Sequence, residues 1–254
     1  MIMTAIDVNS DLGESVGGNP VSDDAAIIEV VSSANVACGF HSGDPHDIAR
    51  TVEAAAARGV AVGAHVGYRD VPGFGRRFID MDPAELADEV LYQIGALDAL
   101  ARSKGTAVTY VKPHGALYNT IVHHEEQAQA VIDGIRAFSR ELPVLLLPGA
   151  VAIEKAEQAG LRAVREAFAD RNYDPDGTLV SRRESDAVVS DPDAVAARVV
   201  QLARERTLLA RDGSTIDIDA ESLCVHGDSP GSVELARRIV DALQDAGIEI
   251  RSFL

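Results

Sequence analysis

The chain has 254 residues, of which 46% are hydrophobic; this suits one α/β domain with a substantial core and excludes a disordered chain. A formal net charge of −17 argues against nucleic-acid binding, because a phosphate backbone would be repelled. No apolar run approaches the roughly 20 residues that cross a bilayer, and the N-terminal segment lacks the basic region of a signal peptide, so we expect a cytoplasmic protein.

Short apolar strands alternate with amphipathic helices along the whole chain. In chain order the predicted elements are a strand at 4–9, a helix from Asp23 or Asp24 to about Ser33, a strand at 34–38, a helix at 45–58, a strand at 60–64, a helix at 83–104, a strand at 107–111, a helix at 125–140, a strand at 144–147, a helix at 150–158, a strand at 162–165, a helix at 192–206, a strand at 222–226 and a helix at 229–244. Such alternation predicts parallel strands covered by helices.

Seven strands and seven helices predict one domain over residues 1–254, a closed or nearly closed seven-stranded β/α barrel of the TIM type. An open doubly wound sheet is the alternative. Two stretches are predicted to be insertions within this domain. The polar residues 170–191 form a long loop, and residues 207–219 have the pattern of a hairpin around Asp212-Gly213.

Polar residues that can do chemistry follow nearly every predicted strand. They are, in chain order, Asn9, Asp11, Glu14, His41, Asp44, His65, Arg76, Arg77, Lys112, His114, Asn119, Glu166, Arg171, Arg182, Arg183, His226 and Asp228. Because the carboxyl ends of parallel strands meet on one face, we expect a shared active site there. Each residue alone has a simpler explanation: Asp44, before Pro45, has the pattern of a helix cap.

Three chemistries remain open for this site. A divalent metal could be bound by His41, His65 and Asp11, but no tightly spaced ligand motif is present, so we expect no metal. A metal-free acid–base site could use Asp11 or a histidine as base, with Lys112 and an arginine holding an anionic substrate. We expect burial to lower the pKa of Lys112 and make it a proton donor, or else a salt bridge to hold it. The third alternative is ligand binding without catalysis.

Six motifs then identify a family. The segments are DVNSDLGE, SANVACGFHSGDP, GAHVGYRD with GFGRR, VKPHGALYN, EAFADRNY and CVHGDSPG, and they occur in this order across the chain. Together they resemble the LamB/YcsF family. Small departures from the family pattern are Ser15, where glycine is expected, Ser42, where alanine is commoner, and Val66, where proline is usual.

The resemblance implies a β/α barrel related to sugar hydrolases and polysaccharide deacetylases. It also implies ATP-dependent opening of the lactam of 5-oxo-L-proline to give L-glutamate, within a 5-oxoprolinase that has partner subunits B and C. ATP with Mg²⁺ would be bound mainly by the partners, which fits the lack of a P-loop motif here, and no tightly bound cofactor is expected. A homo-oligomer is a further expectation.

Our mechanistic hypothesis uses Asp11 or His65 as the base that acts on water or on a phosphorylated lactam. Lys112 and His114 would stabilise the developing charge, and the arginines named above are candidates to hold the substrate carboxylate. Two alternatives stay open. One is a metal-dependent deacetylase or amidohydrolase that acts on a small C–N or sugar substrate, and the other is a non-catalytic protein that only binds a ligand.

Overall fold

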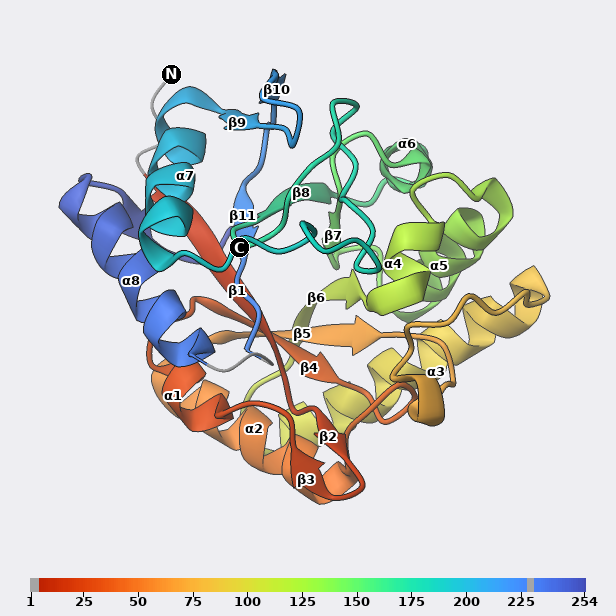
Figure 1. Ribbon diagram of the computed structural model, residues 1–254. Helices are drawn as coiled ribbons and strands as arrows, with labels where there is room; N and C mark the ends of the chain where they lie inside the picture. Colours follow the sequence, from red (N-terminus) through yellow and green to blue (C-terminus); the bar gives the residue numbers. More distant parts are fainter. Residues whose placement is uncertain (1–4, 228–230) are drawn as a thin grey trace.

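The structure of the protein is a computed structural model that describes residues 5–227 and 231–254. Seven parallel strands form a barrel: β1 (Ala5–Leu12), β4 (Ser33–Ala37), β5 (Ala61–Val66), β6 (Val108–Pro113), β7 (Val144–Leu146), β8 (Ala163–Phe168) and β11 (Ser222–Cys224). They pair in this order, and β11 also pairs with β1, which closes the barrel. The predicted seven-stranded barrel is therefore confirmed, and the open sheet is excluded (Figure 1).

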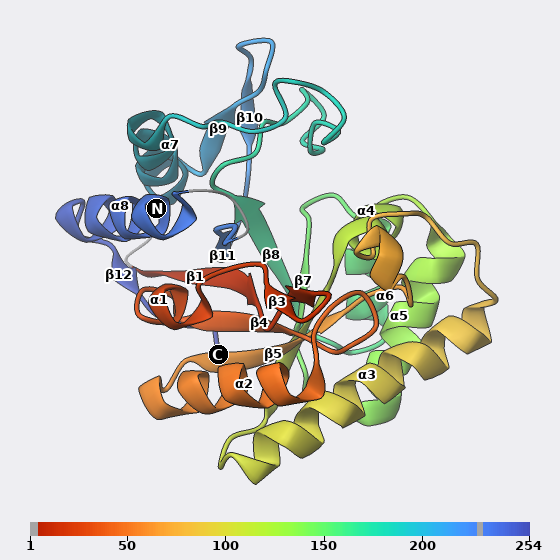
Figure 2. The same ribbon diagram turned by 60° about the horizontal axis from the view of Figure 1, so that its bottom comes forward.

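Helices surround this barrel (Figures 1 and 2). They are α1 (Asp24–Ile28), α2 (Pro45–Arg58), α3 (Pro83–Ser103), α4 (Gly115–Thr120), α5 (Glu125–Phe138), α6 (Val151–Gln158), α7 (Pro192–Glu205) and α8 (Ser232–Asp245), with a short 3₁₀ helix, η1 (Val71–Gly73). In the described part of the chain, no helix is both long and apolar enough to span a membrane.

Three helix starts follow the same local rule. Asp44, Asp82 and Asp191 each precede a proline, and each carboxylate accepts a hydrogen bond from a backbone N–H in the first turn of α2, α3 or α7. The proline loses nothing at this position, since the first N–H groups of a helix have no partner within it. These helices therefore begin where the sequence predicts.

Other elements differ from the prediction. α1 ends at Ile28 instead of about Ser33, because Ser32 and Ser33 already bond to β1: the Ser32 N–H donates to the Val8 carbonyl oxygen over 2.9 Å. α4 is absent from the prediction, and no side chain caps its start. Several barrel strands, β1, β5, β6 and β8 among them, also extend two or three residues further at their carboxyl ends, so several polar residues expected after the strands lie within them.

The smaller elements lie outside the barrel wall. Residues 207–219 form the predicted hairpin, with β9 (Thr207–Leu209) antiparallel to β10 (Thr215–Asp217). β2 (Ser15–Val16) and β3 (Asn19–Pro20) make a second, shorter hairpin, and β12 (Glu249–Ile250) adds to the amino-terminal end of β1. Residues 170–191 contain two isolated bridges and otherwise no regular structure, as expected.

Apolar side chains close the amino-terminal end of the barrel. Tyr110, Leu145 and Val164 are fully buried inside it, and Phe253 packs on them, with its ring edge-on to Tyr110 at a centroid distance of 5.3 Å. The Tyr110 ring occupies the space where a side chain at position 63 would be, since a Cβ on Gly63 would lie 2.2 Å from it. Among the described residues, these side chains fill the amino-terminal end of the barrel, which leaves its carboxyl-terminal end for a pocket.

Asp7 lies near this closed end and is almost fully buried. Its carboxylate accepts hydrogen bonds from the hydroxyls of Ser32, Ser33 and Ser222, yet burial outweighs them and raises its pKa from 3.8 to about 6. The folded protein thus keeps a proton on Asp7 at a pH where the unfolded chain has released it. The resulting stabilisation is complete below pH 3.8 and is lost as the pH rises through about 6.

We therefore expect Asp7→Asn, which cannot ionise, to gain stability relative to the wild type as the pH rises. Between about pH 4.5 and 7.5 the difference in unfolding free energy should move by about 2 kcal/mol in favour of the variant. Urea unfolding of both proteins at the two pH values measures this. A difference that stays constant with pH would show that Asp7 does not titrate in this range.

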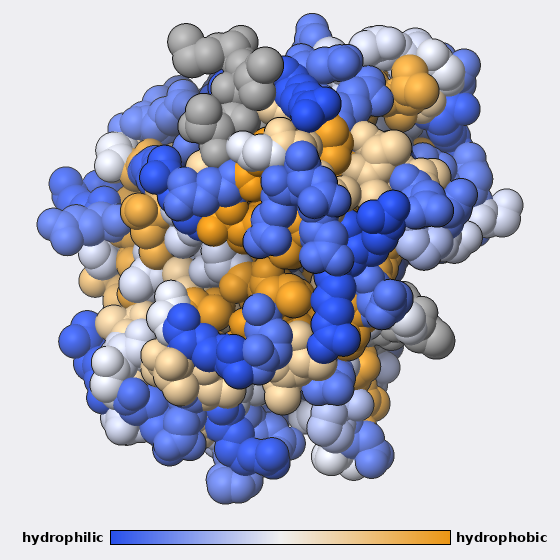
Figure 3. All heavy atoms as spheres, turned by 90° about the vertical axis from the view of Figure 1, so that its left-hand side faces the viewer, coloured by the Kyte–Doolittle hydropathy of each residue, from blue (hydrophilic) through white to orange (hydrophobic). Residues whose placement is uncertain are grey.

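One face of the molecule shows how polar and apolar side chains are distributed on the surface. On the face shown in Figure 3, charged and polar side chains predominate, with apolar side chains visible between them. This agrees with the net charge of −17.

Candidate active site

A column of polar side chains fills the middle of the barrel. Alternate residues of a barrel strand face inward, and here many of these are polar. The Asn9 side-chain amide donates to Ser222 Oγ over 2.7 Å and to Glu166 Oε2 over 3.3 Å. Asn35 Nδ2 donates to Asn9 Oδ1 over 2.7 Å, and the Tyr110 hydroxyl donates to Asn35 Oδ1 over 2.7 Å. This hydrogen-bond network contacts the charged groups of the site.

The Lys112 ammonium lies next to this network, and its side chain is only 2% exposed. Its Nζ is 3.0 Å from Glu166 Oε2, 3.1 Å from Asn9 Oδ1, 3.4 Å from Asp11 Oδ1 and 3.1 Å from the Cys224 sulfur. Burial alone would lower the pKa of Lys112, but the carboxylates of Asp11 and Glu166 outweigh it and raise that pKa well above 10.5. The expectation of a lowered pKa is therefore wrong, and the alternative of a salt bridge is confirmed.

Asp11 stands at the boundary between this column and the open end of the barrel. Its side chain is 18% exposed; Oδ2 lies 3.3 Å from His65 Nε2, and Asn35 Nδ2 donates to Oδ1 over 2.9 Å. Although burial opposes ionisation, His65 and Lys112 hold the pKa of Asp11 well below its usual value. Burial also opposes a charge on His65, but Asp11 and Glu14 outweigh it and raise the His65 pKa.

Three buried histidine rings lie beside Asp11. His114 Nδ1 is 3.0 Å from His65 Nε2, and the two rings are nearly perpendicular. His41 stacks on His114 with centroids 3.7 Å apart, and its Nε2 lies 3.0 Å from Glu14 Oε1. Burial and then the neighbouring histidines hold the pKa values of His41 and His114 well below 6.5, which keeps both rings neutral.

A short loop positions Glu14. The Ser42 hydroxyl accepts from the Ser15 N–H over 2.9 Å and donates to the Ser15 carbonyl oxygen over 2.8 Å. Ser15 and Ser42 are two of the three departures from the family pattern, and together they link the loop after β1 to the loop after β4. The side chain next to Ser15, Glu14, is thereby brought to within reach of His41.

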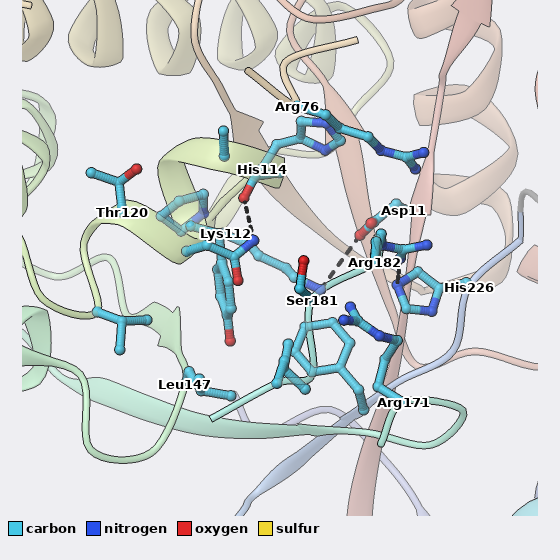
Figure 4. A pocket seen from close by; sticks show the side chains of 18 of the residues that line it. Asp11, Arg76, Lys112, His114, Thr120, Leu147, Arg171, Ser181, Arg182 and His226 are labelled. Atoms are coloured by element: carbon cyan, nitrogen blue, oxygen red, sulfur yellow. Dashed lines mark hydrogen bonds and ion pairs between the residues drawn. The ribbon is translucent and has the colours of Figure 1, made fainter. Parts of the chain in front are cut away.

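One pocket of about 740 Å³ at the open end of the barrel is lined by several of these groups, namely Asp11, Glu14, His65, Lys112 and His114. Figure 4 shows the Lys112 ammonium directed toward Asp11, with Arg182 beside His226. Arg76, Arg182 and Arg183 contribute exposed positive charge to its lining. In a chain of net charge −17, three exposed arginines at one pocket suit an anionic ligand.

The loop at residues 170–191 forms one wall of this pocket. Arg171 is buried and donates to the backbone oxygens of Val180 and Ala187, so it holds the loop together. His226 Nδ1 lies 2.8 Å from Asp170 Oδ1, while Arg182 Nη2 donates to His226 Nε2 over 2.7 Å. His226 is thereby fixed with its proton on Nδ1.

A model of the LamB/YcsF family matches residues 6–254. The chain belongs to the LamB/YcsF family. A protein of Corynebacterium jeikeium (strain K411), named as the A subunit of 5-oxoprolinase, is 68% identical to this LamB/YcsF chain over 250 residues, covering 98% of it and 97% of the relative. The crystal structure of a lactam utilization protein from Thermus thermophilus superposes with a TM-score of 0.93 at 43% identity, covering 98% of this chain and 100% of that one. A family 4 carbohydrate esterase from Streptomyces lividans, solved in complex with acetate, reaches 0.52 at 11% identity over 100% of this chain and 95% of that one, which shows a shared fold alone.

Most of the residues predicted for the site of this LamB/YcsF protein come together. The pocket lining includes Asp11, Glu14, His65, Arg76, Lys112, His114, Asn119, Arg171, Arg182, Arg183 and His226. Asn9, His41 and Glu166 are buried directly behind it. Asn119 lies at the mouth, with its amide donating to the Gly115 carbonyl oxygen.

Three predicted residues are not placed in this pocket. Asp44 caps α2, and Arg77 pairs with the buried Asp70, so neither is among the lining residues. Asp228 lies outside the described residues. The fit of Asp44 to a helix cap was visible in the sequence, whereas the pairing of Arg77 depends on the η1 turn that brings Asp70 beside it.

Sequence reasoning missed several contributors. Asn35 holds both Asn9 and Asp11, and its position two residues after Ser33 in an inward-facing alternation is the signal that could have indicated it. Cys224 is more than a small buried hydrophobe, because its sulfur contacts Lys112 Nζ. His123, which follows α4 and does not follow a barrel strand, is exposed and also lines the pocket.

Proposed function

We propose that the chain is the A subunit of a 5-oxoprolinase, which opens the lactam ring of 5-oxo-L-proline to L-glutamate with ATP. The observation that carries this proposal is the buried Lys112 ammonium beside the partly exposed Asp11 carboxylate at the closed end of the pocket. A lactam carbonyl is a poor electrophile, so its opening needs a donor for the carbonyl oxygen and a base for water. The 68% identity to a protein that bears the 5-oxoprolinase name supports this substrate.

The two groups suit these roles because of what surrounds them. Glu166 and Asn9 hold the Lys112 ammonium in place before any substrate binds, so it can stabilise an oxyanion without reorganising. Asp11 reaches the pocket and carries a negative charge that can accept the proton of an attacking water. In the metal-free site, His65 Nε2, 3.3 Å from Asp11 Oδ2, can share that proton.

The arginines at the mouth suit the carboxylate of the substrate. Arg76, Arg182 and Arg183 line the pocket, and the planar guanidinium group binds a carboxylate through two parallel hydrogen bonds. Arg171 lines the pocket too, but its side chain is buried and holds the loop at residues 170–191 together. We assign the substrate carboxylate to Arg76, Arg182 and Arg183, because their side chains are exposed at the pocket.

We assign ATP and Mg²⁺ mainly to partner subunits B and C, because this sequence contains no P-loop motif. In the proposed order, the γ-phosphoryl group of ATP moves to the lactam oxygen, a first water adds to that carbon and the ring C–N bond breaks. A second water then releases phosphate and leaves glutamate. A pocket of about 740 Å³ has room for the lactam and the phosphoryl group together. An enzyme that consumes ATP in this way would act in the cytoplasm.

Reconstitution tests the proposal. The chain is expressed with the partner subunits encoded in the same genome, and glutamate and ADP are measured with 5-oxoproline and ATP. Glutamate should form only when this chain and its partners are both present, together with an equal amount of ADP. Glutamate formation at the same rate by the partners alone would overturn the proposal, and acetate release from an acetylated sugar by this chain alone would favour the deacetylase alternative.

A further inference from the structure

Four buried side chains offer a compact set of nitrogen and oxygen atoms at the closed end of the pocket. Glu14, His41, His65 and His114 each place one such atom within 4.8 Å of the others. They come from four separate segments of the chain, after or at the ends of β1, β4, β5 and β6. Widely separated residues thus converge on one point.

Backbone carbonyl groups fix the proton on two of these rings. His65 Nδ1 lies 3.0 Å from the carbonyl oxygen of Lys112, and His114 Nε2 lies 2.9 Å from that of Phe74. A carbonyl oxygen can only accept a hydrogen bond, so both of these nitrogens carry a hydrogen. Whenever one of these rings is neutral, its other nitrogen, His65 Nε2 or His114 Nδ1, is therefore the atom that carries a lone pair.

These two lone-pair atoms face each other across only 3.0 Å. Two acceptors at that distance repel unless a cation lies between or beside them, either a proton or a metal ion. Glu14 Oε1 is 3.6 Å from His114 Nδ1, and Asp11 Oδ2 is 3.3 Å from His65 Nε2, which adds negative charge at the same point. The pocket therefore has an electron-rich centre made of nitrogen and oxygen atoms.

The spacing matches a metal coordination sphere. Bonds of about 2.0–2.2 Å in tetrahedral geometry separate neighbouring ligand atoms by about 3.3–3.6 Å. The ligand atoms of His65 and His114 are 3.0 Å apart, those of Glu14 and His114 are 3.6 Å apart, and those of Glu14 and His65 lie within 4.8 Å, so small side-chain shifts would bring all three to one ion. In both His65 and His114, the ring nitrogen that would not bind the ion donates a hydrogen bond to a backbone carbonyl oxygen. Such hydrogen bonds are the usual support for metal-binding histidines. His41 has a different role. Its ring stacks nearly parallel on the His114 ring, with the ring centroids 3.7 Å apart, so it cannot direct a lone pair to the same ion.

His41 instead orients Glu14. Among the described residues, His41 Nδ1 is buried and has no hydrogen-bond partner, so a hydrogen there would be unsatisfied. The hydrogen is better placed on Nε2, which lies 3.0 Å from Glu14 Oε1 and donates to it. This bond holds the carboxylate toward His114.

We propose that Glu14, His65 and His114 bind one divalent transition-metal ion of the Zn²⁺ type, with a fourth position open to the pocket. Two imidazoles and one carboxylate are a ligand set that Zn²⁺ favours, and three protein ligands with one open position are typical of a catalytic site. All three ligands line the pocket, so an ion there could polarise a carbonyl group or a water molecule. The sequence analysis expected no metal and left open a site made of His41, His65 and Asp11; the ligand set proposed here shares only His65 with it. The inference does not depend on the identity of the substrate.

Metal binding by the full-length chain tests it directly. The protein, freed of any affinity tag and treated with a chelator, is dialysed against Zn²⁺ alone, and bound zinc is measured by elemental analysis. One ion per chain should bind, and Co²⁺ in its place should give the intense visible absorption of a four-coordinate site. No substrate, ATP or partner is present, so failure of the proposed function would leave this result unchanged.

Variants locate the ion. His114→Ala and Glu14→Gln should each weaken Zn²⁺ binding by about 100-fold or more, whereas His46→Ala, on the exposed start of α2, should bind as the wild type does. Circular dichroism establishes that each variant is folded. If His114→Ala does not fold, Glu14→Gln still tests the proposal, because glutamine keeps the shape of the glutamate side chain. Absence of bound zinc in the wild type, or equal binding by Glu14→Gln and the wild type, would overturn the proposal.

Discussion

Asp11→Asn is expected to lower the turnover of the assembled enzyme by about 100-fold or more while leaving the barrel folded. The amide keeps the shape of the side chain but cannot accept a proton from water, and it removes the negative charge that faces His65 and Lys112. The fold should survive, because Lys112 keeps its ion pair with Glu166. Replacement of His65 by alanine should reduce turnover to a similar extent.

The measurement is steady-state glutamate production by the complex of this chain with its partners, with thermal unfolding of each variant as a check of folding. Asp88→Asn is the matched control, since Asp88 is exposed on α3 and is not among the residues that line the pocket. It should retain wild-type turnover. If Asp11→Asn and His65→Ala also retained it, the reactive groups would have to be sought elsewhere.

How much of this site was predictable depends on the range of the interactions involved. The helix starts at Asp44, Asp82 and Asp191 rest on contacts within three residues, so the sequence alone indicates them. The end of α1 and the existence of α4 depend on tertiary contacts. No side chain caps the start of α4 at Gly115, so the local sequence does not indicate that a helix begins there.

The same distinction applies to the charged residues. Periodicity predicted that the ends of seven strands would meet, and this brought Asp11, His65 and Lys112 together from distant parts of the sequence. It could not separate the arginines, because Arg77 finds Asp70 and Arg171 finds backbone oxygens only once the loops are folded. Nor could it give the charge state of Lys112, which depends on how many carboxylates surround it, and not on burial alone.

Lys112 is also expected to contribute strongly to the stability of the fold. Lys112→Met should lower the free energy of unfolding by about 3–5 kcal/mol, because removal of one partner of a buried ion pair leaves an uncompensated charge. Glu166 is fully buried, and its Oε2 lies 3.0 Å from the ammonium that the variant lacks. Urea unfolding at neutral pH measures the loss.

Lys104→Met is the matched control for this change. Lys104 pairs with Glu53 over 3.3 Å at the surface, where the Glu53 side chain is 63% exposed, and such pairs contribute about 0–1 kcal/mol. The double variant Lys112→Met with Glu166→Gln should recover part of the lost stability, because the buried carboxylate is then also removed. If Lys112→Met lost no more than Lys104→Met, or if the second change recovered nothing, the ammonium would not be what makes a buried Glu166 tolerable. In that case the barrel would hold its charged column through the Asn9 and Asn35 amides instead.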